Sequence, residues 1–210
     1  MGLLKRCEEV CLKSRNYNGE IVAGSLLVKE SRHVAALLLS GADEKTFHQA
    51  IVVDNVLQKR SPASAKRMLK LIRKRLEGMS SELWLMVRDG NQELATQALL
   101  CAAIKHSHLL GDFLNSTIRS HKRTFKKQLT LHDWSSFFEE CQHLDPEVGD
   151  WVESTLKKIR QVVFRILAEA KVIDSTRLMT LLPFALHPDI KKYLSFKGED
   201  YVLKCLESTQ

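Results

Sequence analysis

The stretch SPASAKRMLKLIRKRLEG, residues 61–78, decides the fold class of this chain. Its apolar side chains recur at the spacing of one helix face. They are Ala65, Met68, Leu69, Ile72 and Leu76. Pro62 suits the first turn of a helix, because the N–H that it lacks would be unpaired there anyway, and Gly78 is a natural C-terminal stop. The stretch therefore predicts a helix over residues 62–77.

The other face of this predicted helix is basic. Residues 59–77 contain eight Lys or Arg and one acid, an excess equal to the net charge of +7 of the whole 210-residue chain. Phosphate oxygens suit such a row, since Arg binds them through paired hydrogen bonds and Lys as a point charge. A solvated helix face normally mixes both signs, which makes phosphate binding the stronger of the two interpretations. The candidate DNA-binding residues are Lys59, Arg60, Ser61, Ser64, Lys66, Arg67, Lys70, Arg73 and Lys74, with Arg75 on the flank.

A second helix is predicted just before the basic one. Asp43 suits its N-cap, and a short break over residues 58–61 separates it from Pro62. Residues 43–77 thus have the shape of a helix-turn-helix, in which the second helix enters the major groove of DNA. Ser61 and Ser64 lie where the N–H groups and hydroxyls of a helix start can meet a phosphate. Any two helices joined by a short turn satisfy this spacing, so the charge distribution carries more weight.

Two further basic clusters lie in the second half of the chain. At a predicted helix end stand Lys122, Arg123, Lys126 and Lys127. Cations there either meet phosphates or complement the helix dipole. On the polar face of a helix predicted over residues 151–170 stand Lys157, Lys158, Gln161 and Arg165. A helix from Thr130 and a turn over 145–149 precede it, so residues 130–170 are a second helix-turn-helix candidate.

The helix that begins at Thr130 lies in an acidic segment. From Gln128 to Glu153 there are seven acids and no Lys or Arg. Like charge would repel DNA, so only the second helix of this pair could approach a duplex. The acids that we expect to stay away from DNA are Glu139, Glu140, Asp145 and Glu147. This surface could instead face a protein partner.

Composition favours an all-α fold. The chain is 44% hydrophobic and 27% charged, and only nine Gly and four Pro are present to form the turns of a many-stranded sheet. We expect two helical units, residues 1–127 and 128–210, with one helix-turn-helix in each. Residues 178–182 could be a short strand or a helix, and a small wing could lie near the C-terminus.

The chain lacks the marks of secretion and of membrane insertion. No apolar segment follows Met1 as in a signal peptide, and the longest apolar run, residues 34–39, is far shorter than the ~20 residues of a membrane span. Five cysteines form no CxxC pair, which fits a reducing compartment. We expect a cytoplasmic protein without membrane contact.

No catalytic signature is present. The sequence has none of the phosphate-loop, dinucleotide, nucleophile-elbow or zinc-protease motifs. His106, His108 and Asp112 are more typical of a helical bundle than of a metal site. Asp189 with Glu199 lacks the Lys that a metal-dependent nuclease wants two residues after the acid. We expect no catalytic residue, no metal and no cofactor.

Three stretches resemble the BrxA family. They are GSLLVKESRHVAA at 24–36, DNVLQKRSPASAKRMLKLIRKRL at 54–76 and QALLCAAIKHSHLLGDFL at 97–114, within a resemblance that covers about residues 20–175. BrxA proteins are core components of BREX bacteriophage-exclusion systems. The resemblance implies an all-helical protein similar to helix-turn-helix proteins, acting on double-stranded DNA and without catalytic residues.

Taken together, the residues and the resemblance predict a monomeric, non-enzymatic protein that binds double-stranded DNA. It would work in a BREX assembly beside other components such as the DNA methyltransferase. Two alternatives stay open: an adaptor whose basic helix docks on an acidic protein, and an RNA-binding helical protein. Single-stranded RNA would be favoured by aromatic residues among the basic ones, and none lies between Lys59 and Glu77.

Overall fold

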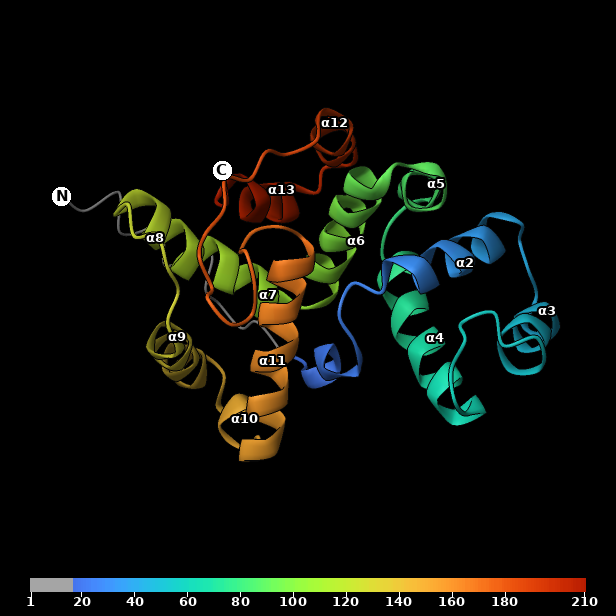
Figure 1. The fold of residues 1–210 in the computed structure, drawn as a ribbon, viewed down its shortest axis with the longest axis horizontal. Helices are drawn as coiled ribbons and strands as arrows, with labels where there is room; N and C mark the ends of the chain where they lie inside the picture. Colours follow the sequence, from blue (N-terminus) through green and yellow to red (C-terminus); the bar gives the residue numbers. More distant parts are fainter. Residues whose placement is uncertain (1–16) are drawn as a thin grey trace.

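The computed structural model describes residues 17–210 of the chain (Figure 1). The expected absence of a signal peptide and the start of the expected unit 1–127 fall on residues 1–16, outside the described residues. In chain order the helices are η1 (Gly19–Ala23), α2 (Val28–Leu39), α3 (Glu44–His48), η2 (Gln49–Val53), α4 (Pro62–Glu77), α5 (Ser81–Asp89), α6 (Gln92–His106), α7 (His108–Phe113), η3 (Leu114–Ile118), α8 (Arg119–Arg123), α9 (Leu131–Leu144), α10 (Pro146–Gly149), α11 (Glu153–Glu169), α12 (Pro188–Lys197) and α13 (Asp200–Glu207).

The expected all-α fold is confirmed. Within residues 17–210 the only β-structure consists of two isolated antiparallel bridges, Gln128 with Thr180 and Ile173 with Leu181. No helix of the described part of the chain is long and apolar enough to cross a membrane.

Helix α6 is the centre of the molecule. Residues 95–104 of α6 are all buried, as expected of a helix that packs on every side. Figure 1 shows α2 to α5 on one side of α6 and α8 to α11 on the other, with α12 and α13 along its upper edge. Helix α6 contacts α2, α4, α5, α7, α12 and α13.

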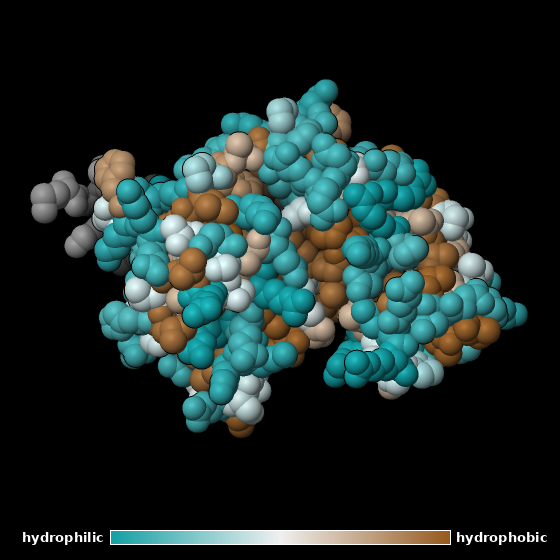
Figure 2. Space-filling model, in the orientation of Figure 1, coloured by the Kyte–Doolittle hydropathy of each residue, from teal (hydrophilic) through white to brown (hydrophobic). Residues whose placement is uncertain are grey.

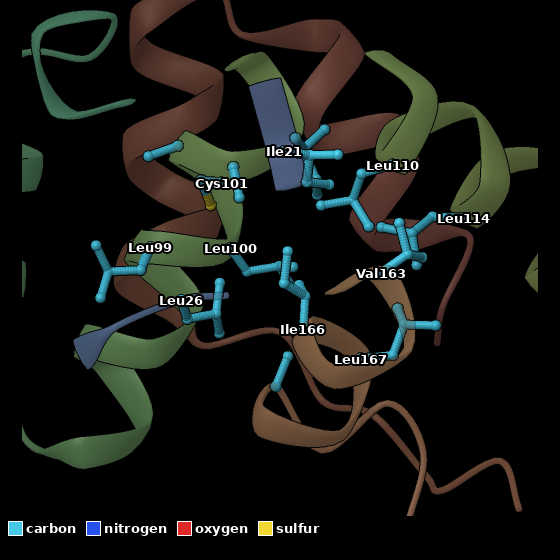
Figure 3. Packing of buried hydrophobic residues seen from close by; sticks show 14 of the residues in the cluster. Ile21, Leu26, Leu99, Leu100, Cys101, Leu110, Leu114, Val163, Ile166 and Leu167 are labelled. Carbon is cyan, nitrogen blue, oxygen red and sulfur yellow. The ribbon is translucent and has the colours of Figure 1, made fainter. Parts of the chain in front are cut away.

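One hydrophobic core joins the two halves of the chain. In Figure 3, Leu100 of α6, Ile21 of η1 and Leu110 of α7 point toward Val163 and Ile166 of α11. All five side chains are completely buried. The core thus crosses residue 127, where we placed the boundary between two units, and that boundary stays a prediction.

The bounds of α4 agree with the sequence, but the connection before it is longer than we expected. The preceding helical stretch, α3 with the π-helical turn η2, ends at Val53, so eight residues and not four separate it from α4. Asn55 has a left-handed backbone with φ 49°, and its side chain bonds the backbone N–H and carbonyl of Lys59. Asn tolerates this conformation and makes such local bonds, which ends the helix early.

The second helix pair also differs from the expected plain turn. Thr130 and Asp133 form a capping box at the start of α9. The predicted turn over 145–149 contains the short helix α10, which Pro146 begins and Asp145 caps. Helix α11 follows, and residues 171–182 then form a tight hairpin carrying the bridge from Ile173 to Leu181. Residues 178–182, left open as strand or helix, form the second half of this hairpin: Leu178 lies in its turn, Met179 has a left-handed backbone with φ 56°, and Thr180 and Leu181 make the bridges.

Candidate nucleic-acid interface

The exposed face of α4 carries basic side chains that no acid neutralises. Lys66, Arg67 and Lys70 are exposed along this face, and Arg60 is exposed just before the helix starts. Within residues 17–210, none of these four forms an ion pair. They therefore present their positive charge to solvent.

Two other predicted DNA-binding residues brace α4 against its neighbours. Lys59 Nζ lies 2.7 Å from Glu30 Oε1, and both side chains are largely buried. Burial opposes ionisation of Glu30, but the hydrogen bond from Lys59, a backbone hydrogen bond and the charges of Lys59 and Lys29 together hold the pKa of this carboxyl below its ordinary value. Arg73 Nη1 lies 2.7 Å from Glu44 and its Nε 3.0 Å from Glu77, with the guanidinium 4.5 Å from the ring centre of Phe47.

Lys74 shares its acidic partner with a histidine. Its Nζ lies 2.5 Å from Glu20 Oε2, which also lies 2.9 Å from His106 Nε2. The hydrogen bond from Lys74 lowers the pKa of the Glu20 carboxyl, while burial lowers the pKa of His106. Glu20 belongs to η1, so this contact ties α4 to η1 and α6.

Arg75 is the basic residue of α4 that the sequence misplaced. We expected it on a solvent-facing flank, yet it is only 3% exposed. Its guanidinium donates to the carbonyls of Ser25 and Gly24, the latter at 3.0 Å, and burial lowers its pKa to about 10. The buried face of α4 is rotated toward Leu71 and Arg75, while Met68 and Leu69 are only half-buried. Arg75 therefore holds the fold together and is not available to a ligand.

The two serines at the start of α4 mainly cap the helix. Ser61 Oγ accepts from the Ser64 N–H at 3.3 Å and donates to Ser64 Oγ at 3.0 Å. Both side chains are half-buried. Ser61 is thus engaged within the helix start, and no contact in the structure bears on a phosphate there.

The second basic cluster, within residues 122–127, has one side chain turned inward and three turned outward. Lys122 is half-buried and its Nζ donates to the carbonyl of Leu182 at 3.1 Å, while burial lowers its pKa. Arg123, Lys126 and Lys127 are exposed and have no ion pair within residues 17–210. The sequence missed Lys204 of α13, which the fold brings close to Lys122 and Arg123.

The predicted side chains of α11 all face solvent. Lys157, Lys158 and Gln161 are exposed, and Arg165 is 69% exposed although its Nε lies 3.1 Å from Glu169. Glu169 also accepts from Ser25 Oγ and from the Leu26 N–H, so its position is fixed by the core. Arg165 is therefore partly neutralised, and Lys157 and Lys158 keep their charge.

The hairpin after α11 gives the C-terminal half the element order of a winged helix. An extended residue at Gln128 precedes α9, α11 follows, and the hairpin pairs back onto Gln128. Asp174 fixes the hairpin tip, since its Oδ1 accepts from the N–H groups of Ser175 and Thr180. Arg177 is exposed at that tip and was missed by the sequence analysis. The Asp-Ser pair between two apolar runs was the signal that could have found it.

The two exposed basic helices lie on either side of η1. Helix η1 packs against both α4 and α11. Figure 2 shows hydrophilic surface over both regions, with a hollow of apolar residues between them. A cavity of about 170 Å³ also opens beside Arg67 and Lys70, with Val22 and Leu71 in its wall.

The acidic helix α9 keeps most of its charge at the surface. Glu139 and Glu140 are exposed, as is Glu147 of α10. Asp145 differs from the expectation, because it is buried and its carboxylate accepts from the Tyr17 N–H at 3.0 Å. Asp145 is therefore a structural residue and not part of an acidic surface.

The residues considered for a metal site have other partners. His106 bonds Glu20, His108 packs edge-on against Tyr201 at 5.3 Å, and Asp112 accepts from the hydroxyls of Tyr17 and Tyr201. No group of three His, Cys, Asp or Glu in the described part of the chain could hold a metal ion.

Comparison with known proteins gives one consistent family. A family model described as BrxA matches residues 15–198. The chain is 43% identical over 191 residues to the BREX protein BrxA of Paramagnetospirillum magneticum (strain ATCC 700264 / AMB-1), covering 91% of this chain and 96% of that protein. It is 32% identical over 189 residues to the BREX protein BrxA of Escherichia coli O9:H4 (strain HS), covering 90% and 89%. A crystal structure of an uncharacterized protein from Magnetospirillum magneticum matches with a TM-score of 0.84 and 41% identity, covering 91% and 98%.

Proposed function

The chain belongs to the BrxA family, and from this premise we propose that it is a non-enzymatic, double-stranded DNA-binding component of a BREX phage-defence system. It binds the duplex mainly through phosphates, as a monomer, beside other BREX components such as the DNA methyltransferase. The basic face of α4 is the principal contact, and α11 with its hairpin is the second.

One observation carries this proposal: Arg60, Lys66, Arg67 and Lys70 are exposed without an acidic partner among residues 17–210. The fold pairs Lys59, Arg73 and Lys74 with acids and buries Arg75, so the other four cations are the ones that the region leaves exposed and unneutralised. A duplex carries one negative charge per ~1.7 Å of axis, and binding cations releases its condensed counterions. A surface with several free cations therefore binds a long polyanion such as a DNA duplex most tightly, because each contact releases counterions.

The exposed face offers no Asn or Gln, the side chains that read adenine edges. Arg67 can still read guanine, so we expect a weak sequence preference. Scrambling the sequence of a bound duplex should change affinity by less than ~100-fold at physiological salt. A larger loss would contradict binding through phosphates.

The proposal is tested with Lys66, Arg67 and Lys70 together changed to Gln. Gln keeps a helix propensity close to that of Lys and Arg, and exposed changes of this kind alter stability by less than ~0.5 kcal/mol each. If all three meet phosphates, the slope of log K against log salt should shrink by about 0.9 per contact, or nearly three in all. Fluorescence anisotropy of a labelled duplex, titrated at several salt concentrations, measures this slope.

A matched control removes the same charge elsewhere. Lys29, Lys45 and Lys192 are exposed on α2, α3 and α12, and their joint change to Gln should leave the slope nearly unaltered. An unchanged affinity in the folded α4 variant would remove α4 as the binding element. Equal losses in the variant and the control would mean that affinity comes from diffuse charge.

The second candidate function is an adaptor whose basic helix docks on an acidic protein, and the exposed acids of α9, which would repel DNA, favour a protein contact in this assembly. A groove of about 410 Å³ between α9 and α11 has Trp134, Phe138 and Leu156 in its lining, together with Glu139, Glu153, Lys157 and Arg160. A competition experiment with poly-glutamate of the same total charge as the DNA duplex distinguishes the two candidates. A DNA-binding protein should release poly-glutamate when the duplex is added, whereas an adaptor should bind poly-glutamate at least as tightly as the duplex. An RNA duplex added in the same way tests the RNA-binding alternative.

A further inference from the structure

Helix α8 ends in an exposed aromatic residue with an unusual backbone. Phe125 is 89% exposed, and its φ of 55° lies in the left-handed region. The Lys126 N–H donates to the His121 carbonyl at 2.9 Å and the Phe125 N–H to the Lys122 carbonyl at 3.3 Å. These two bonds make a Schellman motif with Phe125 at the position that Gly usually takes. The chain thus puts a large apolar ring into water at a position where the backbone disfavours it.

Cations flank this residue in the chain. Arg123, Lys126 and Lys127 lie within two residues of Phe125, are exposed and form no ion pair within residues 17–210. Phe125 is therefore an aromatic residue interleaved with basic ones, the arrangement that α4 lacks. Proteins that bind single strands combine these two features, with a base on the ring and the backbone along the cations.

A basic hollow begins at Arg123, two residues before Phe125 in the chain. It measures about 490 Å³ between α8 and α13, and its lining includes Arg119, Arg123 and Lys204. The one acid in its wall, Glu207, lies 3.1 Å from Lys191 and is neutralised by it. The fold brings Lys204 to α8 across about eighty residues of sequence, so this hollow is a product of the tertiary structure. Its size and charge suit the phosphates that flank a stacked base.

We propose that the end of α8 is a binding site for an unpaired strand of nucleic acid, with one base stacked on Phe125 and the neighbouring phosphates in the hollow between α8 and α13. An unpaired strand fits better than a duplex, because bases in a duplex are already stacked and a step would have to open. DNA and RNA strands share this chemistry. The site is separate from α4, since the two lie toward opposite ends of the long axis of the molecule (Figure 1).

The test is Phe125→Gly, a variant that should not weaken the fold. Gly is favoured at a left-handed helix end, so the thermal midpoint should rise slightly while the ring is lost. Affinity for a labelled 15-nucleotide oligo(dT) or oligo(U) should fall about ten-fold, within the range of one lost base stack. Affinity for a 15-base-pair DNA duplex should stay the same, which separates this site from α4.

Phe196→Ala is the matched control. Phe196 is 81% exposed on α12 with Lys197 Nζ 5.5 Å from its ring centre, but it lies in another helix than Arg119 and Arg123, which line the hollow. Its loss should leave strand binding unchanged. Phe125→Trp should keep strand binding, and its emission should be quenched by oligo(dT) but not by inorganic polyphosphate.

Three results would overturn the proposal. The wild-type protein could show no single-strand binding, or Phe125→Gly could bind the strands as well as wild type does. A larger loss on the duplex than on the strands would make Phe125 a wedge between paired bases. Changing Lys66, Arg67 and Lys70 to Gln, in contrast, bears on the duplex proposal alone, so either proposal can fail without the other.

Discussion

Helices α4 and α11 look unequal in the sequence and much more alike in the structure. Eight Lys or Arg lie in residues 59–77, against four in residues 153–169. Around α4 the fold pairs three of the eight with acids and buries a fourth, Arg75. On α11 only Arg165 has an acidic partner among the described residues. The charge that a helix presents is therefore not the charge that its sequence contains.

The two regions also differ in the number of free cations and in the elements that surround the basic helix. Helix α4 together with Arg60 just before it presents four unneutralised cations, but an eight-residue connection separates the helix from the one before it. Helix α11 presents fewer, yet it has a hairpin beside it and the element order of a winged helix. The first region suits a phosphate row, and the second suits a helix placed in a groove with an adjacent wing.

The largest effect expected from this comparison concerns stability. Arg75→Ala should lower the free energy of unfolding by about 3 kcal/mol, because the carbonyls of Gly24 and Ser25 lose a charged donor in a buried site. Urea unfolding followed by circular dichroism measures it. Duplex affinity of the folded protein should not change.

Arg67→Ala is the control for that change. It removes an equal charge from the same helix, but the exposed side chain should contribute less than ~0.5 kcal/mol to stability. Similar stability losses in the two variants would show that the division of α4 into structural and exposed bases is wrong.

The next prediction compares the contributions of α11 and α4 to duplex binding. Changing Lys157 and Lys158 together to Gln should shrink the salt slope of duplex binding by about 1.8, from two lost phosphate contacts. The affinity should fall by roughly 60-fold near 0.1 M salt. Anisotropy titrations of this variant beside the α4 variant give the ratio of the two contributions. No loss here, with a full loss on α4, would make α11 a protein-facing helix.

Local signals in the sequence were enough to predict the helices of the candidate site. Pro62 and Gly78 fixed the bounds of α4, and Thr130 fixed the start of α9, because capping depends on residues within one turn. The acid-rich character of α9 was also readable from composition. These features need no knowledge of the tertiary fold.

The sequence did not show which cations stay exposed, because the acids that pair with Lys59 and Lys74 are distant from them in the chain. Glu30 lies 29 residues from Lys59, and Glu20 lies 54 residues from Lys74. The early end of the helix before α4 depended on the left-handed Asn55, which the apolar pattern hid. Asp145 was assigned to the surface by its charge, but it is buried and accepts from the N–H of Tyr17, a residue 128 positions away in the chain. Burial of a charge follows from the packing of remote segments, which a single sequence does not display.

A smaller effect is expected at the hairpin tip. Arg177→Gln should lower duplex affinity by about 8-fold near 0.1 M salt and the salt slope by about 0.9, as for one phosphate contact. Lys171→Gln is the control, since Lys171 is exposed at the base of the same hairpin. Equal losses in the two variants would show that the hairpin tip has no special role and would weaken the winged-helix interpretation.

The smallest effect tests the acidic neighbour that distinguishes α11 from α4. Changing Glu139 and Glu140 of α9 together to Gln removes two exposed negative charges near α11, so duplex affinity should rise by about 3-fold at low salt. The increase should disappear near 1 M salt, where the screening length is only ~3 Å. Asp145→Asn is the contrast: its buried carboxylate accepts from the Tyr17 N–H, so this change should lower stability and leave duplex affinity unaltered. A clear loss of affinity in the folded Glu139 and Glu140 variant would place α9 at the DNA, and α11 would then approach the duplex from a different side than its hairpin indicates.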